Sequence, residues 1–311
     1  MKNQPRAFLI YTVRSPEAKY KLKAVIKIIH AFEKISNTGF RGRCVQKFLY
    51  GLLKIIHPRA KRIDDNLKLV YPNHDKAWRK KMRSEIYKQF AWTITELLAL
   101  QRDHSQVFEW VKKVEGIEIF DDVIKNKRGA IYLACHFGNW ELLGSWYAQY
   151  AKKHGHELSS MYQEIHDPDF NEYIHEMRLR SSMKLLPKDL SIPKLTRLLK
   201  NGENIAILND VSGSTKMIVP FLGHNATNIS GPAVLSLLSG VPIIPVGIFR
   251  IKPFEHVIKV FEPLEIPDKS LNHEERVKKL VIESNDALAK IILSRPELWF
   301  WLHNRWKNVN L

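Results

Sequence analysis

The residues with the clearest chemical potential are His136 and Glu141, which lie five positions apart. His136 follows a short apolar run, residues 130–135, with the length and composition of a buried strand. Asn139 is a good helix N-cap, and apolar residues recur at helical spacing from Trp140 onward. The pattern therefore predicts a strand, a tight turn and a helix, which would allow the glutamate to fold back onto the imidazole.

Such a pair has a defined chemistry. A carboxylate bound to one ring nitrogen fixes the tautomer of the imidazole and leaves the other nitrogen free to act as a general base. We therefore interpret His136 as a candidate base and Glu141 as the residue that orients it. The site would lie at the carboxyl end of a strand, where sites form in open α/β sheets. Spacing alone is also compatible with a buried histidine and a structural partner.

Other candidate groups stand at the ends of predicted elements. Arg178 and Arg180 close a predicted helix and could bind a phosphate or stabilise an oxyanion. Solvated arginines at a helix C-terminus are the alternative interpretation. Asp210 follows the predicted strand 204–209, which again places a carboxylate at the carboxyl end of a strand.

Missing motifs exclude several enzyme classes. The chain has no Gly-x-Ser-x-Gly elbow, no Walker or dinucleotide-binding glycine pattern after a strand, and no zinc-ligand spacing. Its two cysteines, Cys44 and Cys135, exclude a disulfide framework. Because Cys135 lies in an apolar strand, we expect a buried, inert thiol rather than a nucleophile. We predict neither a metal nor a cofactor.

The elements that would position these groups change character along the chain. After a helical region, predicted strands alternate with helices, which is typical of a largely parallel sheet covered on both faces. We therefore predict an α/β fold, with a basic helical region over residues 1–112 and an α/β core over residues 113–311. Strands are expected near 115–119, 130–135, 158–163, 182–186, 204–209, 241–249 and 256–261, and helices near 120–127, 140–153, 169–181, 191–201, 230–239 and 273–294.

The positive charge is concentrated in the helical region. Residues 1–112 hold 24 Lys and Arg against 9 Asp and Glu, which accounts for most of the net charge of +17. Within residues 19–56, basic residues alternate with apolar ones, so we expect basic amphipathic helices on an anionic membrane surface. Packing on the core is the alternative. No nucleic-acid-binding motif accompanies the charge, and no apolar run is long enough for a membrane span.

The string at residues 136–141, His-Phe-Gly-Asn-Trp-Glu, resembles the signature of a known family. The family is that of the bacterial lipid A secondary acyltransferases (lauroyl and myristoyl transferases), within the lysophospholipid acyltransferase-like superfamily that shares a His-x4-Asp/Glu motif. Residues 219–245 are similar to its Phe-x-Gly turn, small-residue helix and Val-Pro-x-x-Pro strand. Residues 300–307 are similar to its aromatic ending, and the resemblance covers most of residues 58–307.

The resemblance implies a glycerolipid acyltransferase-like fold and a membrane-associated O-acyltransferase. From the basic charge and the apolar helical faces of the first 56 residues we predict peripheral attachment to the cytoplasmic face of a bacterial inner membrane. His136 would deprotonate a hydroxyl of a lipid A-type glycolipid while that hydroxyl attacks an acyl thioester. The thioester, on acyl carrier protein or coenzyme A, is a co-substrate and not a cofactor. Arg180 and Asp210 would join the catalytic pair, and the implied substrate-binding residues are Asn139, Arg178, Ser230, Arg305 and Lys307.

One block departs from the family pattern. Family members that acylate lipid A usually carry Pro-Asp-x-Asp where this chain has Leu208-Asn209-Asp210. Asp210 matches one of the acids, but the proline and the second acid are absent. A lysophospholipid, a polyene glycolipid or an amino-acid lipid is therefore an alternative acceptor. A non-catalytic basic module that binds membrane or nucleic acid is the alternative from another functional class.

Overall fold

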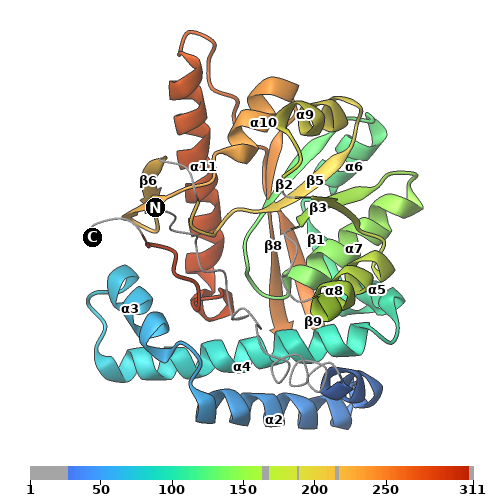
Figure 1. Cartoon of the computed structure of the whole chain (residues 1–311), viewed down its shortest axis with the longest axis vertical. Coiled ribbons are helices and arrows are strands. Elements are labelled where there is room, and N and C mark those ends of the chain that lie inside the picture. Colours follow the sequence, from blue (N-terminus) through green and yellow to red (C-terminus); the bar gives the residue numbers. More distant parts are fainter. Residues whose placement is uncertain (1–26, 163–167, 188, 214–216, 308–311) are drawn as a thin grey trace.

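Seven strands form the central sheet of the computed structural model, which describes residues 27–162, 168–187, 189–213 and 217–307 (Figure 1). Neighbouring strands run parallel, except for the antiparallel pair β8 and β9. This confirms the predicted α/β fold with a mostly parallel sheet. The order across the sheet is β1 (Val111–Glu115), β9 (Glu255–Val260), β8 (Ile243–Lys252), β2 (Ala130–Ala134), β5 (Asn204–Leu208), β3 (Leu158–Tyr162) and β4 (Lys184–Pro187).

Helices cover both faces of this sheet (Figure 1). The predicted helices over 140–153 and 273–294 match the observed bounds at both ends. Residues 27–35 are also helical. The helices are α2 (Phe40–Ile56), α3 (Ala60–Val70), α4 (Lys76–Leu100), α5 (Val107–Trp110), α6 (Ile117–Lys125), α7 (Trp140–Lys153), α8 (Pro168–Arg180), α9 (Ile192–Lys200), α10 (Gly231–Ser239) and α11 (His273–Ser294), with short 3-10 turns at His104–Gln106 and Pro296–Leu298.

Strand β2 is buried on both faces, which explains its uninterrupted apolar sequence. Ile131 and Leu133 belong to one apolar cluster, which also contains Leu280 and Leu288 of α11. Tyr132, between them, belongs to a second cluster with residues of α7. Side chains alternate between the two faces of a strand, so β2 joins both halves of the core.

The predicted strand at 115–119 is wrong. Strand β1 ends at Glu115, and Gly116 takes a left-handed φ of +78° immediately before α6. A β carbon at Gly116 would lie 2.4 Å from the Val260 carbonyl oxygen, so the chain turns where only glycine fits.

Residues 219–245 also include most of a short hairpin that the sequence periodicity did not predict. Its strands are β6 (Ile218–Phe221) and β7 (His224–Thr227), each only four residues long. The two residues between them, Leu222 and Gly223, both have positive φ, as a tight hairpin turn requires. The predicted turn after Phe221 is therefore present, as the turn of this hairpin.

The described part of the helical region, residues 27–112, shares its core with the sheet. Ile63 of α3 and Ile86 of α4 lie in the first apolar cluster, while Trp92 and Leu100 of α4 lie in the second. Helix α2 packs on α4 at the edge of the molecule (Figure 1). The division at residue 112 stays a prediction.

The predicted amphipathic segment is described only from residue 27 onward, because residues 19–26 lie outside the described part of the chain. Among the described helices, none combines the length and the apolar character that a membrane span needs.

Candidate active site

The turn between β2 and α7 has the predicted form. Gly138 has a φ of +59°, and a β carbon there would lie 2.1 Å from the Ile248 carbonyl oxygen of β8. Glycine is therefore required both by the backbone conformation and by the close approach of the neighbouring strand. Asn139 caps α7, because its Oδ1 accepts a hydrogen bond from the Leu142 N–H at 3.1 Å.

The carboxylate bound to His136 belongs to Asp210, which follows β5. His136 Nδ1 lies 2.8 Å from Asp210 Oδ1, and the His136 N–H donates to Asp210 Oδ2 at 3.0 Å. The prediction that Glu141 forms this hydrogen bond is wrong. The reason is the sheet order: Ala134 of β2 pairs with Leu208 of β5, so the residues that follow the two strands lie side by side.

Asp210 is fully buried. Burial by itself would raise its pKa, but His136 and the hydrogen bonds hold the pKa of Asp210 well below its ordinary value. One of these bonds comes from the Trp299 indole N–H, which donates to Oδ2 at 2.8 Å. The sequence analysis named Asp210 as a candidate catalytic residue, but it did not identify Trp299, which hydrogen-bonds to Asp210.

The C-terminal segment completes the turn around His136. The Gly138 N–H donates to the Leu298 carbonyl, and the Phe300 N–H donates to the His136 carbonyl, each at 2.9 Å. The aromatic ending of the chain therefore fixes the backbone on both sides of Phe137. The backbone pairing of Phe137 with Trp299 also places the Trp299 side chain next to Asp210.

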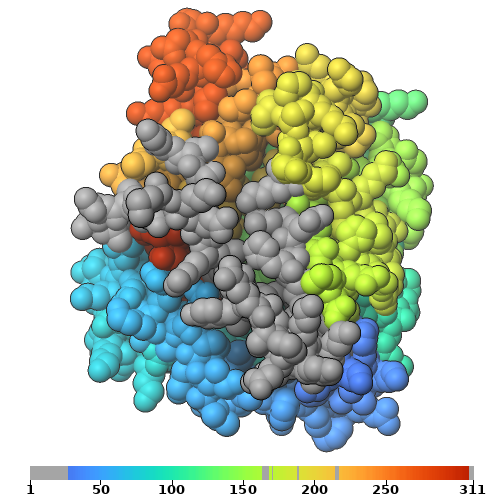
Figure 2. All heavy atoms as spheres, in the orientation of Figure 1, coloured from blue at the N-terminus to red at the C-terminus, as the bar shows by residue number. Residues whose placement is uncertain are grey.

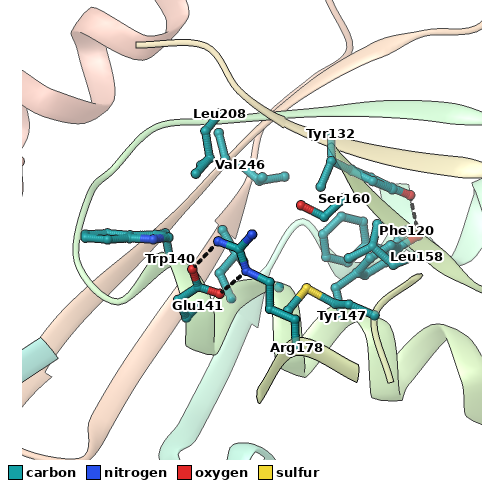
Figure 3. Close-up of a pocket in the computed structure, with 15 residues that line it drawn as sticks. Phe120, Tyr132, Trp140, Glu141, Tyr147, Leu158, Ser160, Arg178, Leu208 and Val246 are labelled. Carbon is teal, nitrogen blue, oxygen red and sulfur yellow. Dashed lines mark hydrogen bonds and ion pairs between the residues drawn. The ribbon is translucent and has the colours of Figure 1, made fainter. Parts of the chain in front are cut away.

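Glu141 forms an ion pair with Arg178 of α8 (Figure 3). Its two carboxylate oxygens lie 2.7 and 3.3 Å from Arg178 Nη2 and Nε. Burial by itself would raise the pKa of Glu141, but Arg178 and, to a smaller extent, His136 lower it. The glutamate is therefore a fixed negative charge close enough to interact electrostatically with the imidazole.

The His136 ring lies among other rings, and its side chain retains 19% exposure. The centroids of Trp140 and His303 are each 5.1 Å away. Burial, followed by the proximity of His136, lowers the pKa of His303 to about 4, so His303 is neutral at pH 7. With Nδ1 of His136 held by Asp210, Nε2 is the nitrogen that can exchange a proton with a substrate.

The two arginines at the end of α8 occupy different places. Arg178 reaches Glu141, whose negative charge raises the pKa of the guanidinium. Arg180 instead forms an exposed ion pair with Glu176 at 2.9 Å, so the prediction that it is catalytic has no support in this geometry. Residues two positions apart on a helix point in different directions, which the sequence motif alone does not resolve.

The predicted substrate-binding residues are also divided. Arg305 is fully buried; it donates to the Thr227 carbonyl at 2.6 Å and to Asn228, and stacks on Phe221 at 4.2 Å. Burial lowers the pKa of Arg305 to about 10. A guanidinium with no exposed surface anchors the C-terminal segment, so its assignment to substrate binding is wrong.

Three further predictions concern Asn139, Ser230 and Lys307. Asn139 is buried, and its amide is bound within the protein by Leu142 and Glu96, so it holds the turn and does not face a substrate. Ser230 and Lys307 are partly exposed, and their roles stay predictions. Cys135 is buried, as predicted, and burial raises the pKa of its thiol.

A mostly apolar cavity begins at the Glu141–Arg178 pair and lies between α7 and the sheet (Figure 3). Tyr132 and Tyr147, whose hydroxyls are hydrogen-bonded to each other, line it away from that pair (Figure 3). This cavity has no signature in the sequence because its wall combines residues of several strands and helices. The remaining lining residues are Phe120, Ala134, Trp140, Leu143, Gly144, Leu158, Ser160, Met183, Ala206, Leu208 and Val246.

Comparison with known proteins shows a match over most of the chain. The family model for bacterial lipid A biosynthesis acyltransferases matches residues 38–308. The lipid A biosynthesis lauroyltransferase of Escherichia coli strain K12 is 25% identical over 264 residues, which cover 82% of this chain and 81% of that enzyme. The lipid A biosynthesis palmitoleoyltransferase of the same strain is 24% identical over 247 residues, which cover 78% of this chain and 76% of that enzyme.

A solved structure also matches. It is the crystal structure of a 1-acyl-sn-glycerophosphate acyltransferase from Thermotoga maritima, with a TM-score of 0.36 and 17% sequence identity. The match covers 81% of this chain and 96% of that chain.

Proposed function

Because the chain belongs to the family of bacterial lipid A biosynthesis acyltransferases, we propose that it moves a fatty acyl group from a thioester to a hydroxyl of a lipid A-type glycolipid. The donor would be acyl carrier protein or coenzyme A. The observation that carries this proposal is the His136–Asp210 pair, which stands beside the Glu141–Arg178 pair and an apolar cavity.

His136 acts as the base in this proposal. Its Nε2 takes the proton from the acceptor hydroxyl while the hydroxyl oxygen attacks the thioester carbonyl carbon. When the tetrahedral intermediate collapses, the carbon–sulfur bond breaks and the imidazolium returns its proton to the leaving sulfur. Asp210 keeps the proton-bearing Nδ1 in place and stabilises the imidazolium, and a base held in this way contributes about a hundred- to ten-thousand-fold to the rate.

The negative oxygen of the intermediate requires hydrogen-bond donors. The first N–H groups of a helix have no acceptor within the helix, so those of Trp140 and Glu141 in the first turn of α7 are candidates. They lie close to His136 in the chain. Arg178 is less suited to this role than its charge suggests, because Glu141 already engages its guanidinium.

The acyl chain would occupy the cavity behind Glu141 and Arg178. Its largely apolar lining suits a hydrocarbon chain, and burial of each methylene stabilises a bound chain by about 0.8 kcal/mol. With the chain in this cavity, the thioester carbonyl would stand at the end that Trp140 and Glu141 line. The acceptor hydroxyl would then approach from the side of His136.

We further propose that α2 attaches the protein peripherally to the cytoplasmic face of a bacterial inner membrane. Figure 2 shows α2 along the lower edge of the molecule, and its Phe40 and Ile55 are 81% and 79% exposed. Arg41, Lys47 and Lys54 are in the same helix. Exposed apolar side chains and basic residues on one helix match an anionic lipid interface.

The proposal is tested by supplying purified protein with acyl carrier protein and coenzyme A thioesters, and with a panel of acceptors. We expect mass spectrometry to show one added acyl group on an underacylated lipid A-type glycolipid. Transfer only to a lysophospholipid, a polyene glycolipid or an amino-acid lipid would contradict the proposal that the acceptor is a lipid A-type glycolipid. These other acceptors are included because this chain lacks the second acid that the family pattern has near Asp210.

A further inference from the structure

Behind the β2–α7 turn lies a buried ionic cluster that the reaction described above does not use. Glu96 of α4 and His256 of β9 are fully buried, and Arg250 of β8 is 3% exposed. Arg250 Nε and Nη2 donate to the two carboxylate oxygens of Glu96 at 2.9 and 2.8 Å. His256 Nε2 lies 3.2 Å from Glu96 Oε1, and the Phe254 N–H donates to the same oxygen.

A buried ion pair adds little net stability compared with apolar residues of the same size, so its role must be sought in what it contacts. Glu96 Oε2 accepts a hydrogen bond from Asn139 Nδ2 at 3.0 Å. The other atom of that amide, Oδ1, accepts from the Leu142 N–H. A chain of hydrogen bonds therefore runs from Arg250 through Glu96 and Asn139 to the first turn of α7.

A second connection reaches the preceding residue of the turn. Thr93 Oγ1, one helical turn before Glu96 on α4, donates to the Gly138 carbonyl at 3.0 Å. The same Oγ1 accepts from Arg250 Nη2 at 2.9 Å. The cluster therefore contacts two consecutive residues, Gly138 and Asn139, which lie between His136 and Glu141 in the chain.

We propose that Thr93, Glu96 and Arg250 are positioning residues for acyl transfer, which set the turn at Gly138 and Asn139 and thereby place His136 relative to the N–H groups of α7. The inference rests on the proposed function, because it assigns a task to the same site. Asp210 and Trp299 fix the imidazole from one side of the turn, and the cluster fixes the backbone from the other.

The connection matters because catalysis depends on placement. An error of about 1 Å between reacting groups can lower a rate about a hundredfold without loss of the fold. The hydrogen bond from Thr93 Oγ1 to the Gly138 carbonyl restricts the backbone of a glycine, which without it has the largest conformational freedom in the turn. Loss of that bond is therefore expected to affect turnover more than substrate affinity.

Helix α4 offers a matched control. Thr93 and Thr95 are both buried, and each Oγ1 lies within hydrogen-bond distance of the carbonyl oxygen four residues earlier, at 3.2 and 2.8 Å. In Thr93 the single hydroxyl proton is shared between that carbonyl and the carbonyl of Gly138. Thr93 alone of the two has described hydrogen bonds to the turn and to Arg250. Replacement of either by valine removes a hydroxyl from the same helix while keeping the β-branched shape.

The test measures kcat and KM for the acyl donor, together with thermal unfolding, in Thr93→Val and Thr95→Val. We expect Thr93→Val to lose about ten- to a hundredfold in kcat while KM changes by less than about twofold, and Thr95→Val to retain kcat. Thr93→Ser, which restores the hydroxyl, should recover most of the lost turnover. If the valine variants do not fold, Thr93→Ala and Thr95→Ala replace them in the same comparison.

Equal kcat in the two variants, at equal thermal stability, would overturn the positioning role. A loss confined to KM would overturn it as well, because the turn would then serve binding. Failure of the proposed function has a different result, in which folded His136→Ala protein transfers acyl groups as fast as the unchanged enzyme.

Discussion

At His136, one histidine interacts with two carboxylates of different kinds. Asp210 forms the hydrogen bond to Nδ1 and is itself held by Trp299, while Glu141 is ion-paired with Arg178 and acts on the imidazole only through its charge. A carboxylate that is both buried and hydrogen-bonded stays ionised because its partners offset the cost of burial. Asp210 is therefore the residue best placed to hold the imidazole in the tautomer that leaves Nε2 free to accept a proton.

This assignment predicts a specific loss in Asp210→Asn. The amide cannot stabilise the imidazolium as a carboxylate does, so we expect kcat to fall by about a hundredfold or more. Introduced into His136→Ala, the same change should cause little further loss, because residues that act as a unit have non-additive effects. Steady-state kinetics on the four proteins measures this, and additive losses would show that Asp210 acts apart from His136.

The sequence predicted the histidine but not its partner, and the reason is physical. Spacing along the chain shows that Glu141 lies within reach of His136, but it does not show that β5 lies next to β2. Asp210 and Trp299 are 74 and 163 residues beyond His136 in the chain, and only the sheet order and the C-terminal segment bring them together. Arg178 and Arg180 could not be distinguished because both end the same predicted helix.

At the scale of elements, α7 joins the turn to the cavity. Its first residues, Trp140 and Glu141, stand beside His136, while Gly144 and Tyr147 line the cavity further along the helix. The helix α7 was predictable because the Asn139 cap and the helical spacing of its apolar residues agree. The strand at 115–119 was misplaced because Gly116 and its contact with Val260 determine where β1 ends.

Gly144 offers a direct test of the cavity. A β carbon at this position would lie 2.9 Å from Met183 Sδ, so Gly144→Ala narrows the space beside α7. We expect kcat/KM to fall most for the longest acyl donors, by roughly fourfold for each methylene that is excluded at about 0.8 kcal/mol. A series of thioesters of increasing chain length measures this, and the short donors serve as the internal control. An equal loss for all chain lengths would place the acyl chain elsewhere.

At the scale of the whole molecule, the described part of the basic helical region, residues 27–112, packs with the α/β core as one structure. Helix α4 carries Glu96 and Thr93 to the turn on one side and packs against α2 on the other. Its residues also enter both apolar clusters of the core. The element that helps to hold the active-site turn therefore also supports the helix that we propose binds the membrane.

The membrane proposal predicts the effect of changes in α2. Phe40→Ser with Ile55→Ser removes two exposed apolar side chains and should weaken binding to anionic vesicles about tenfold or more. Binding of the unchanged protein should also weaken as salt rises, because screening reduces the attraction of the basic residues. Vesicle sedimentation measures both. Ile266→Ser, an exposed isoleucine outside α2, is the control, and equal binding by all three proteins would contradict the proposal.

The central claim is that His136 is the base for acyl transfer to a lipid A-type hydroxyl. The most direct measurement is the single-turnover rate of transfer from an acyl thioester to that acceptor by His136→Ala, after thermal unfolding has shown that the variant is folded. We expect the rate to fall by about a hundred- to ten-thousand-fold, which is the contribution of a positioned base. Near-normal transfer by the folded variant would contradict the claim.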